Sequence, residues 1–207
     1  MVDFSLNGTL DLALYLLALI NPVSKVFILT VLSTEHRDKE LQRMALKSTM
    51  LAFTVLLSFA ILGTLILKRL FHVEIYSLKV TGGLVLFFIG YKAISQGKFF
   101  EVPQDTKLTD VSIVPLVSPM MAGPATITAV ISFSSDVGQI VTATAVFIAL
   151  TVNLAVMMSY RKISDLLTKL SLMSPLIRLT GLIVSTIAVQ MILDGLSEWF
   201  KSMTYPF

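Results

Sequence analysis

The chain consists of long apolar segments separated by short polar ones. Each apolar segment is long enough to cross about 30 Å of hydrocarbon at about 1.5 Å per helical residue. Six such segments occur, at 7–32, 44–67, 75–95, 111–133, 139–160 and 175–197. They are continuously apolar, whereas the strands of a membrane barrel alternate. The pattern therefore predicts six transmembrane helices, because a helix satisfies its own backbone hydrogen bonds in lipid.

Composition supports the same class of protein. Hydrophobic residues make up 55% of the 207, charged residues 14%, and mean hydropathy is +0.84. A soluble domain carries more polar surface than this. No linker rich in Pro, Gly or Ser divides the chain. We therefore expect an all-α integral membrane protein in which residues 1–207 form a single transmembrane domain surrounded by membrane lipid.

Basic residues predict the orientation in the membrane. They gather in the connections after the first, third and fifth spans, at Arg37, Lys39, Arg43, Lys47, Lys92, Lys98, Lys107, Arg161, Lys162 and Lys169. By the positive-inside rule these connections face the cytoplasm. We expect a multi-pass protein of the prokaryotic inner membrane with both termini outside. The net charge of +3 largely reflects this asymmetry, so no nucleic-acid partner is expected.

Residues that carry enzymatic or metal chemistry are scarce. The chain has no cysteine, and its two histidines, His36 and His72, fall in predicted loops. A buried metal or acid–base centre based on histidine has nothing to be built from inside the predicted spans, and no Ser/His or paired-acid centre is found at depth. The sequence therefore indicates neither an enzyme nor a metalloprotein, and it predicts no cofactor.

Two motifs of the first half recur in the second half. The first and fourth spans share a helix-breaking dipeptide followed two residues later by a hydroxyl residue, in Asn21-Pro22-Val23-Ser24 and Gly123-Pro124-Ala125-Thr126. The third and sixth spans share an apolar, basic, apolar, Thr, Gly sequence, at 78–82 and 177–181. Residues 1–100 and 105–207 are thus predicted to be two copies of a three-helix unit. Because three spans reverse the side of entry, the copies form a 3+3 inverted-topology repeat, which is common in secondary transporters.

Each proline interrupts its span near the bilayer midplane, so helices 1 and 4 are predicted to be discontinuous. Proline has no amide hydrogen and clashes with the carbonyl four residues earlier, but it is well tolerated at the first position of a new helix. Each break then provides a helix N-terminus whose N–H groups and partial positive charge suit a carboxylate. The carbonyls that end the preceding half-helices, near Ile20 and Ala122, suit an ammonium group or Na⁺.

Anion donors beside cation acceptors describe a site for a small zwitterionic amino acid. A lone proline more often only kinks a membrane helix, but two breaks at matching places favour a binding site. The residues predicted to bind the substrate are Asn21, Pro22, Val23, Ser24, Gly123, Pro124, Ala125 and Thr126. Thr81, Gly82, Thr180 and Gly181 are predicted to support them, mainly by letting helices pack closely.

Three side chains near the breaks have two interpretations. The hydroxyls of Ser24 and Thr126 either bond back to their own helix or face the substrate. Lys25 lies one turn past the first break and is expected to extend its ammonium toward the cytoplasm. The alternative is that Lys25 adds positive charge near the site.

These motifs also resemble a known family. The segment 114–127, with Asn21-Pro22, Thr81-Gly82-Gly83 and the segment 190–195, resembles the MarC/SnatA family over essentially the whole chain. The resemblance implies a six-helix inner-membrane protein, and some members of that family transport small neutral amino acids such as glycine and alanine. Many members have Gly and a second Pro where this chain has Ser24 and Phe27, which changes the expected shape of the first break.

The sequence therefore predicts a secondary transporter of small neutral amino acids. Glycine and alanine are the expected substrates, with serine as a further candidate, and transport would proceed by alternating access around the two breaks. The alternatives are a channel, an exporter of another small solute and a non-transporting scaffold. The coupling ion, Na⁺ or H⁺, and the formation of a homo-oligomer are left open.

Overall fold

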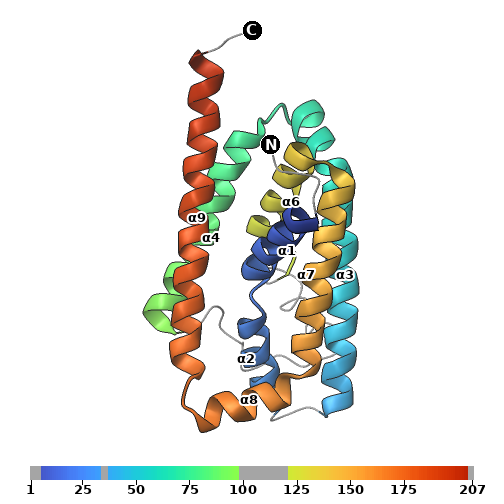
Figure 1. Ribbon diagram of the computed structural model, residues 1–207, viewed down its shortest axis with the longest axis vertical. Coiled ribbons are helices and arrows are strands. Elements are labelled where there is room, and N and C mark those ends of the chain that lie inside the picture. Colours follow the sequence, from blue (N-terminus) through green and yellow to red (C-terminus); the bar gives the residue numbers. More distant parts are fainter. Residues whose placement is uncertain (1–5, 34–36, 98–120, 205–207) are drawn as a thin grey trace.

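The computed structural model describes residues 6–33, 37–97 and 121–204, and within these ranges the regular structure is entirely helical (Figure 1). The elements are α1 (Leu6–Ile20), α2 (Pro22–Leu32), α3 (Asp38–Leu65) with a π-helical turn η1 (Ile66–Leu70), α4 (Ile75–Gln96), α6 (Pro124–Val137), α7 (Gln139–Met158), α8 (Tyr160–Lys169) and α9 (Met173–Thr204).

Within the described residues, 5 helical segments are long and apolar enough to cross a membrane, at Gly8–Leu32, Asp38–Leu70, Ile75–Gln96, Gln139–Met158 and Met173–Thr204. They match the first, second, third, fifth and sixth predicted spans, which confirms the all-α membrane class. The fourth predicted span is described only in part, because α6 begins at Pro124 and positions 111–120 lie outside the described residues. The six-span inverted repeat stays a prediction.

Two long helix pairs flank a central group of shorter helices. α4 packs along α9 on one side, α3 packs along α7 on the other, and α1, α2 and α6 lie between the pairs (Figure 1). The third and sixth predicted spans are therefore neighbours, and so are the second and fifth, an arrangement compatible with a two-fold relation between the halves. α8 crosses one end of the bundle, called here the α8 end. The other end, where α3 leads into α4, is called the η1 end.

The outer surface of the bundle is apolar. Leu14, Phe88, Ile140 and Phe147 are 63%, 68%, 83% and 58% exposed, respectively. Large apolar side chains on the outside would be unfavourable in water, but they suit contact with lipid. The buried interior contains many small residues, among them Ala13, Ala45, Ala52 and Ala149.

α4 and α9 approach closely through glycines. A Cβ added at Gly83 would lie 2.7 Å from the Ala188 carbonyl oxygen, and one at Gly195 would lie 2.7 Å from the Tyr76 carbonyl oxygen. Such distances leave no room for a side chain. Small residues allow this backbone contact between membrane helices, where packing replaces the hydrophobic effect as the source of stability.

The connection after α7 differs from the sequence prediction. The fifth span was predicted to reach residue 160, but α7 ends at Met158, and the chain turns at Ser159 into the short helix α8. One face of α8 is buried through Tyr160 and Ser164, while Leu166 and Lys162 are exposed. Such an amphipathic helix is typical of a membrane interface. The alternation of apolar and polar positions in α8 covers only 10 residues, several of them charged, so the sequence did not indicate a separate helix.

Candidate functional site

The predicted break in the first span is confirmed. α1 ends at Ile20 and α2 begins at Pro22, with Asn21 between them in the left-handed conformation (φ 54°, ψ 81°). Proline disfavours the α conformation of the residue before it, so Asn21 cannot continue α1. Among residues with a side chain larger than hydrogen, asparagine adopts the left-handed region most readily. The Asn-Pro dipeptide thus ends one helix and begins the next.

The side chain of Asn21 has a donor group without a partner. Its Oδ1 accepts a hydrogen bond from the Ser24 amide at 3.3 Å, and the Ser24 hydroxyl donates to the Asn21 carbonyl at 2.7 Å. Asn21 is 6% exposed, and its Nδ2 has no partner within the described part of the chain. A buried amide that makes no hydrogen bond costs free energy, and these two N–H groups have no acceptor among the described residues.

Of the two interpretations of Ser24, the structure supports the bond back to its own helix. Its hydroxyl bonds back to Asn21, and its amide is capped by the same residue, so Ser24 stabilises the first turn of α2. Pro22 and Val23 are half-buried beside it. Around this break, the Asn21 amide group is the side-chain donor left without a partner among the described residues.

The predicted direction of Lys25 is wrong. Its side chain is 1% exposed, and its ammonium donates to the Ile20 carbonyl at the end of α1. The cause is helix geometry, because side chains on a helix lean toward its N-terminus. For α2 that direction leads back to the break, whereas the α8 end lies in the direction of its C-terminus.

The second break is described from Met121 onward. α6 begins at Pro124 with Gly123 as its N-cap, and the Ile127 amide donates to the Gly123 carbonyl at 2.9 Å. A new helix therefore starts where the sequence predicted one, while the half-helix predicted before it lies outside the described residues. Ala125 and Thr126, in the first turn of α6, are buried, and Pro124 is exposed.

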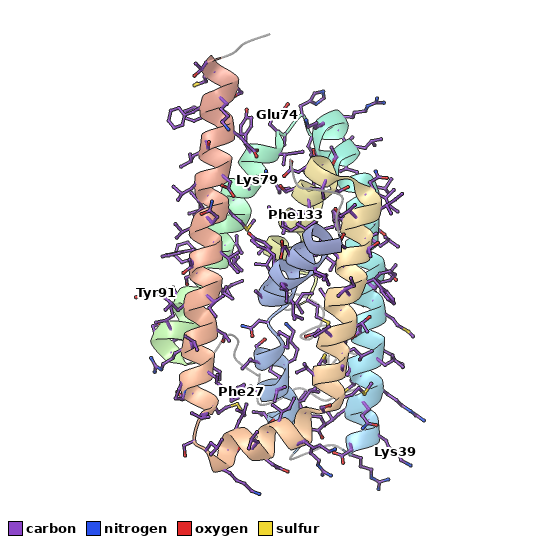
Figure 2. The ribbon with its side chains drawn as sticks, viewed as in Figure 1. Phe27, Lys39, Glu74, Lys79, Tyr91 and Phe133 are labelled. Atoms are coloured by element: carbon purple, nitrogen blue, oxygen red, sulfur yellow. The ribbon has the colours of Figure 1, made fainter. Side chains whose placement is uncertain are left out.

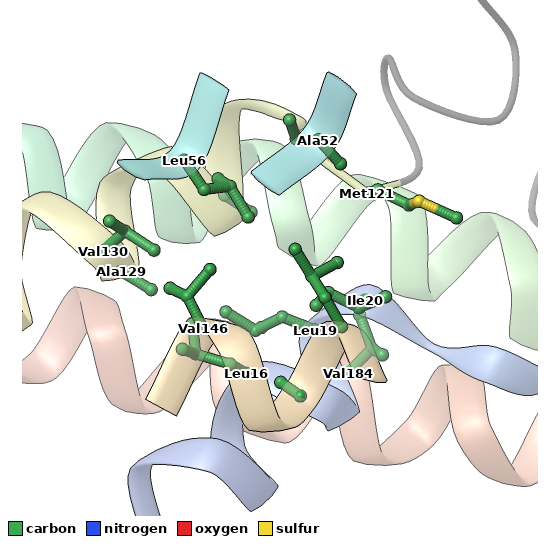
Figure 3. Packing of buried hydrophobic residues seen from close by; sticks show 14 of the residues in the cluster. Leu16, Leu19, Ile20, Ala52, Leu56, Met121, Ala129, Val130, Val146 and Val184 are labelled. Carbon is green, nitrogen blue, oxygen red and sulfur yellow. The ribbon is translucent and has the colours of Figure 1, made fainter. Parts of the chain in front are cut away.

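Both breaks share one core. The buried cluster includes Leu19 and Ile20, just before the first break, together with Met121 and Ala122, just before the second (Figure 3). α1 and α6 pack against each other between the two helix pairs, and Tyr15 of α1 contacts Phe133 of α6 edge to face with ring centroids 5.2 Å apart. Residues next to both helix starts thus belong to the protein interior.

The four predicted supporting residues lie on the α4–α9 pair. The Thr81 hydroxyl donates to the Ser77 carbonyl at 3.0 Å, and the Thr180 hydroxyl donates to the Leu176 carbonyl at 2.8 Å. A Cβ added at Gly82 would meet Thr128 of α6, and one added at Gly181 would meet Ala93 of α4 at 2.8 Å. Their surroundings favour the packing role over contact with a ligand.

The η1 end holds an ion cluster that the sequence did not reveal. Lys79, which is 7% exposed, lies where α4 runs beside α9 (Figure 2) and pairs with Glu198 at 2.5 Å and Asp136 at 3.2 Å. Its counterpart in the repeated motif, Arg178, donates to the Ile94 carbonyl near the end of α4. Each basic residue therefore lies in the first two turns of its own helix and binds near the end of the partner helix. In the sequence, the motif shared by 78–82 and 177–181 was the only indication that α4 and α9 are paired in this way.

The α8 end is held by a second polar cluster. Asp38, the first residue of α3, accepts a hydrogen bond from the Tyr160 hydroxyl at 2.6 Å and pairs with Arg161, also at 2.6 Å. Burial and the bond to Asp38 raise the pKa of Tyr160 to about 12, while the charge of Arg161 opposes this shift. The phenol therefore stays protonated and keeps donating at physiological pH. This cluster joins α8 to the start of α3.

The cluster at the η1 end gives an asymmetric prediction. Glu198→Gln is expected to cost about 2 kcal/mol, because it weakens the compensation of a buried ammonium. Lys79→Met should cost less, under about 1 kcal/mol, because the carboxylates left behind are half-exposed and can be hydrated. Thermal unfolding in detergent measures both, with Lys201→Met as a control for charge loss at an exposed site. A larger loss for Lys79→Met than for Glu198→Gln would contradict this account.

Other candidate sites lie away from the breaks or are not found. A shallow groove of about 280 Å³ lies on α3, lined by Phe53, Thr54, Leu57, Ser58, Ile61 and Leu62. It includes neither break. In the ranges that the structure covers, no group of three or more acidic or histidine side chains is placed to hold a metal ion.

The fold and the site define a multi-span helical membrane protein with an interrupted helix in its interior. The model of the MarC family of integral membrane proteins matches residues 6–200. This chain belongs to the MarC family. No solved structure matches it.

Named relatives are similar over nearly their whole length. The UPF0056 membrane protein PH0214 of Pyrococcus horikoshii is 32% identical over 190 residues, 92% of this chain and 94% of the relative. The UPF0056 membrane protein YvbG of Bacillus subtilis is 32% identical over 200 residues, 91% of this chain and 94% of the relative. The UPF0056 inner membrane protein MarC of Citrobacter koseri is 27% identical over 206 residues, 90% of this chain and 93% of the relative.

Proposed function

We propose that this protein is a secondary transporter of small neutral amino acids, with glycine, alanine and serine as substrates. The observation that carries the proposal is the Asn21 side chain, buried at the start of α2 with an unpartnered amide group. Two N–H donors at a helix N-terminus inside the protein suit a carboxylate, which every amino acid carries. The start of α6 at Pro124 supplies a second N-terminus in the same core.

The size of the substrate follows from the packing around the breaks. Ser24, Ala122, Ala125 and Thr126 are all buried, at 4%, 6%, 5% and 3% exposure. All four lie in the packed interior, so a ligand with a long side chain would have to displace buried groups. Because core packing is rigid, this favours substrates whose side chain is hydrogen, methyl or hydroxymethyl.

Alternating access needs a closure at each end, and the two polar clusters are suited to this role. Asp38 with Arg161 closes the α8 end, and Lys79 with Asp136 and Glu198 closes the η1 end. Opening one end while the other stays closed would expose the breaks to one side at a time. In our proposal the α8 end faces the cytoplasm of a prokaryotic inner membrane, since its connections are rich in Lys and Arg.

Uptake of labelled alanine and glycine into proteoliposomes tests the proposal. The purified full-length protein is expected to accumulate both under an imposed ion gradient or membrane potential, and unlabelled serine should compete. Leucine, whose side chain is too large for the packed core, should compete far less. Absence of both uptake and binding under all gradients would overturn the proposal.

A bulky residue at Gly123 distinguishes a transporter from a non-transporting scaffold. Gly123 has extended backbone angles (φ −80°, ψ 172°), which any residue adopts, so Gly123→Val tests bulk rather than backbone strain. The variant should reach the membrane in near-normal amounts but lose about tenfold in alanine uptake, equivalent to roughly 1.4 kcal/mol. A scaffold predicts the opposite pattern, a lower yield of folded protein with no activity to lose. A channel predicts flux that follows the gradient without accumulation.

A further inference from the structure

Lys25 is the most deeply buried ionisable side chain in the described part of the chain. It is 1% exposed, compared with 7% for Lys79. The charge of Lys79 is compensated by two carboxylates, Asp136 and Glu198. The ammonium of Lys25 donates to a backbone carbonyl, that of Ile20. A buried charge needs compensation, so this carbonyl position matters energetically.

The Ile20 carbonyl belongs to the last residue of α1. Pro22 has no amide hydrogen, so the Ala18 carbonyl loses its usual helical partner. The Ile20 carbonyl would pair with the Ser24 amide in a continuous helix, but the Asn21 side chain accepts from that amide. Carbonyls at a helix C-terminus carry partial negative charge and attract a cation. Broken helices in transporters use such carbonyls to hold Na⁺. In this chain a covalently attached cation reaches the same position.

Two cations cannot share this position. Unit charges a few ångströms apart repel by about 4 kcal/mol even at the effective dielectric constant of a protein surface. Sodium would therefore have to displace the Lys25 ammonium, whose side chain is only 1% exposed. The ammonium also adds positive charge to the first turn of α2, the helix that Asn21 caps.

We propose that the Lys25 ammonium is the resident cation of the first break, taking the carbonyl position that sodium would otherwise take, so that this protein binds and moves its substrate without sodium. The statement that transport needs no sodium rests on the proposed transport function. The assignment of Lys25 as the resident cation does not rest on it. The substrate ammonium is then directed to the second break, because the Ile20 carbonyl is occupied.

The first test compares sodium with choline in proteoliposomes that contain the full-length protein. At equal ionic strength and equal membrane potential, alanine uptake should differ by less than twofold between the two salts. A tenfold or larger fall on removal of sodium would overturn the inference while leaving the transport function intact. Loss of uptake in both salts would overturn the transport function instead, and the second test would still decide the role of Lys25.

The second test needs no transport. In detergent, the unfolding temperature of the wild-type protein should be the same in NaCl and in choline chloride. Lys25→Ala opens the carbonyl position, so the variant should gain a rise of roughly 3 °C or more that is specific to NaCl. Lys25→Arg keeps the cation and should behave like the wild type.

Two further variants complete the second test. Lys39→Ala removes the same charge from an exposed position at the start of α3 and should show no sodium effect. If Lys25→Ala does not fold, Lys25→Met replaces it, because its unbranched apolar chain fills most of the same volume. The assignment would be overturned if sodium raised the unfolding temperature of the wild type. It would also be overturned if sodium raised the unfolding temperature of neither Lys25→Ala nor Lys25→Met, provided that these variants fold.

Discussion

Asn21→Asp is expected to abolish high-affinity binding of alanine while the protein still folds and reaches the membrane. Aspartate keeps the shape of the side chain, the cap on the Ser24 amide and the tolerance for the left-handed conformation. It replaces the buried N–H donors by an oxygen that repels a carboxylate. Loss of charge-assisted hydrogen bonds, each worth about 1.5–3 kcal/mol, predicts a fall in affinity on the order of 100-fold.

Binding and uptake are both measured for this variant, with Asn153→Asp as the matched control. Asn153 is fully buried on α7 and donates to the Met157 sulfur at 3.4 Å, so the control places a carboxylate at a similarly buried position. The control should retain alanine binding to the extent that it folds. Equal losses in the two variants would mean that burial of a carboxylate, and not its place at the break, removes the function.

Asn21→Gly separates the backbone from the side chain at the same position. Glycine adopts the left-handed conformation without cost, so the break should persist. The cap and the donors are both lost, and alanine affinity should fall as in the aspartate variant. Normal affinity in Asn21→Gly would show that the Asn21 amide group takes no part in binding.

The break at Asn21-Pro22 was predictable because its cause is local. Proline restricts the residue before it and cannot donate a hydrogen bond, and asparagine tolerates the left-handed region, so two adjacent residues determine where α1 ends. The same reasoning predicted the start of α6 at Pro124. Both predictions used covalent geometry, which does not depend on the rest of the fold.

The environment of Lys25 was not predictable in the same way. The hydrophobic pattern indicates that a lysine in a span will extend its ammonium toward water. It does not indicate at which helix end the ammonium finds water or a carbonyl acceptor. In the structure the Lys25 ammonium donates to the Ile20 carbonyl across the break. The energetic choice depends on a neighbouring helix end, which becomes known only once the break itself is placed.

The repeated Thr-Gly motif shows a second limit of sequence reasoning. Gly82 and Gly181 occupy matching positions, yet Gly82 faces Thr128 of α6, whereas Gly181 faces Gly90 and Ala93 of α4. A glycine allows close approach of any backbone or side chain, so its presence predicts a contact without specifying the partner. The charge partners of Lys79 were hidden for the same reason, since Asp136 and Glu198 lie far away in the sequence.

Gly90→Ala is expected to cause the largest loss of stability among single-methyl additions on α4. The added Cβ would overlap the Ser185 hydroxyl and lie 2.8 Å from the Gly181 carbonyl oxygen and 2.9 Å from the Ser185 amide nitrogen. Overpacking costs about 1–3 kcal/mol, and two of these three contacts are with backbone that cannot rotate away. We expect about 3 kcal/mol, or a fall of roughly 6–12 °C in the unfolding temperature.

A second substitution tests whether the backbone contact is the cause. Adding Ser185→Ala to Gly90→Ala removes the overlap with the hydroxyl but leaves both backbone contacts, so only part of the lost stability should return. Ser95→Val, on an exposed face of the same helix, controls for added bulk and should change the unfolding temperature little. Full recovery in the double variant would mean that the Ser185 side chain sets the limit. Partial recovery would locate the constraint in the approach of the α4 and α9 backbones, on which the position of Lys79 beside Glu198 also depends.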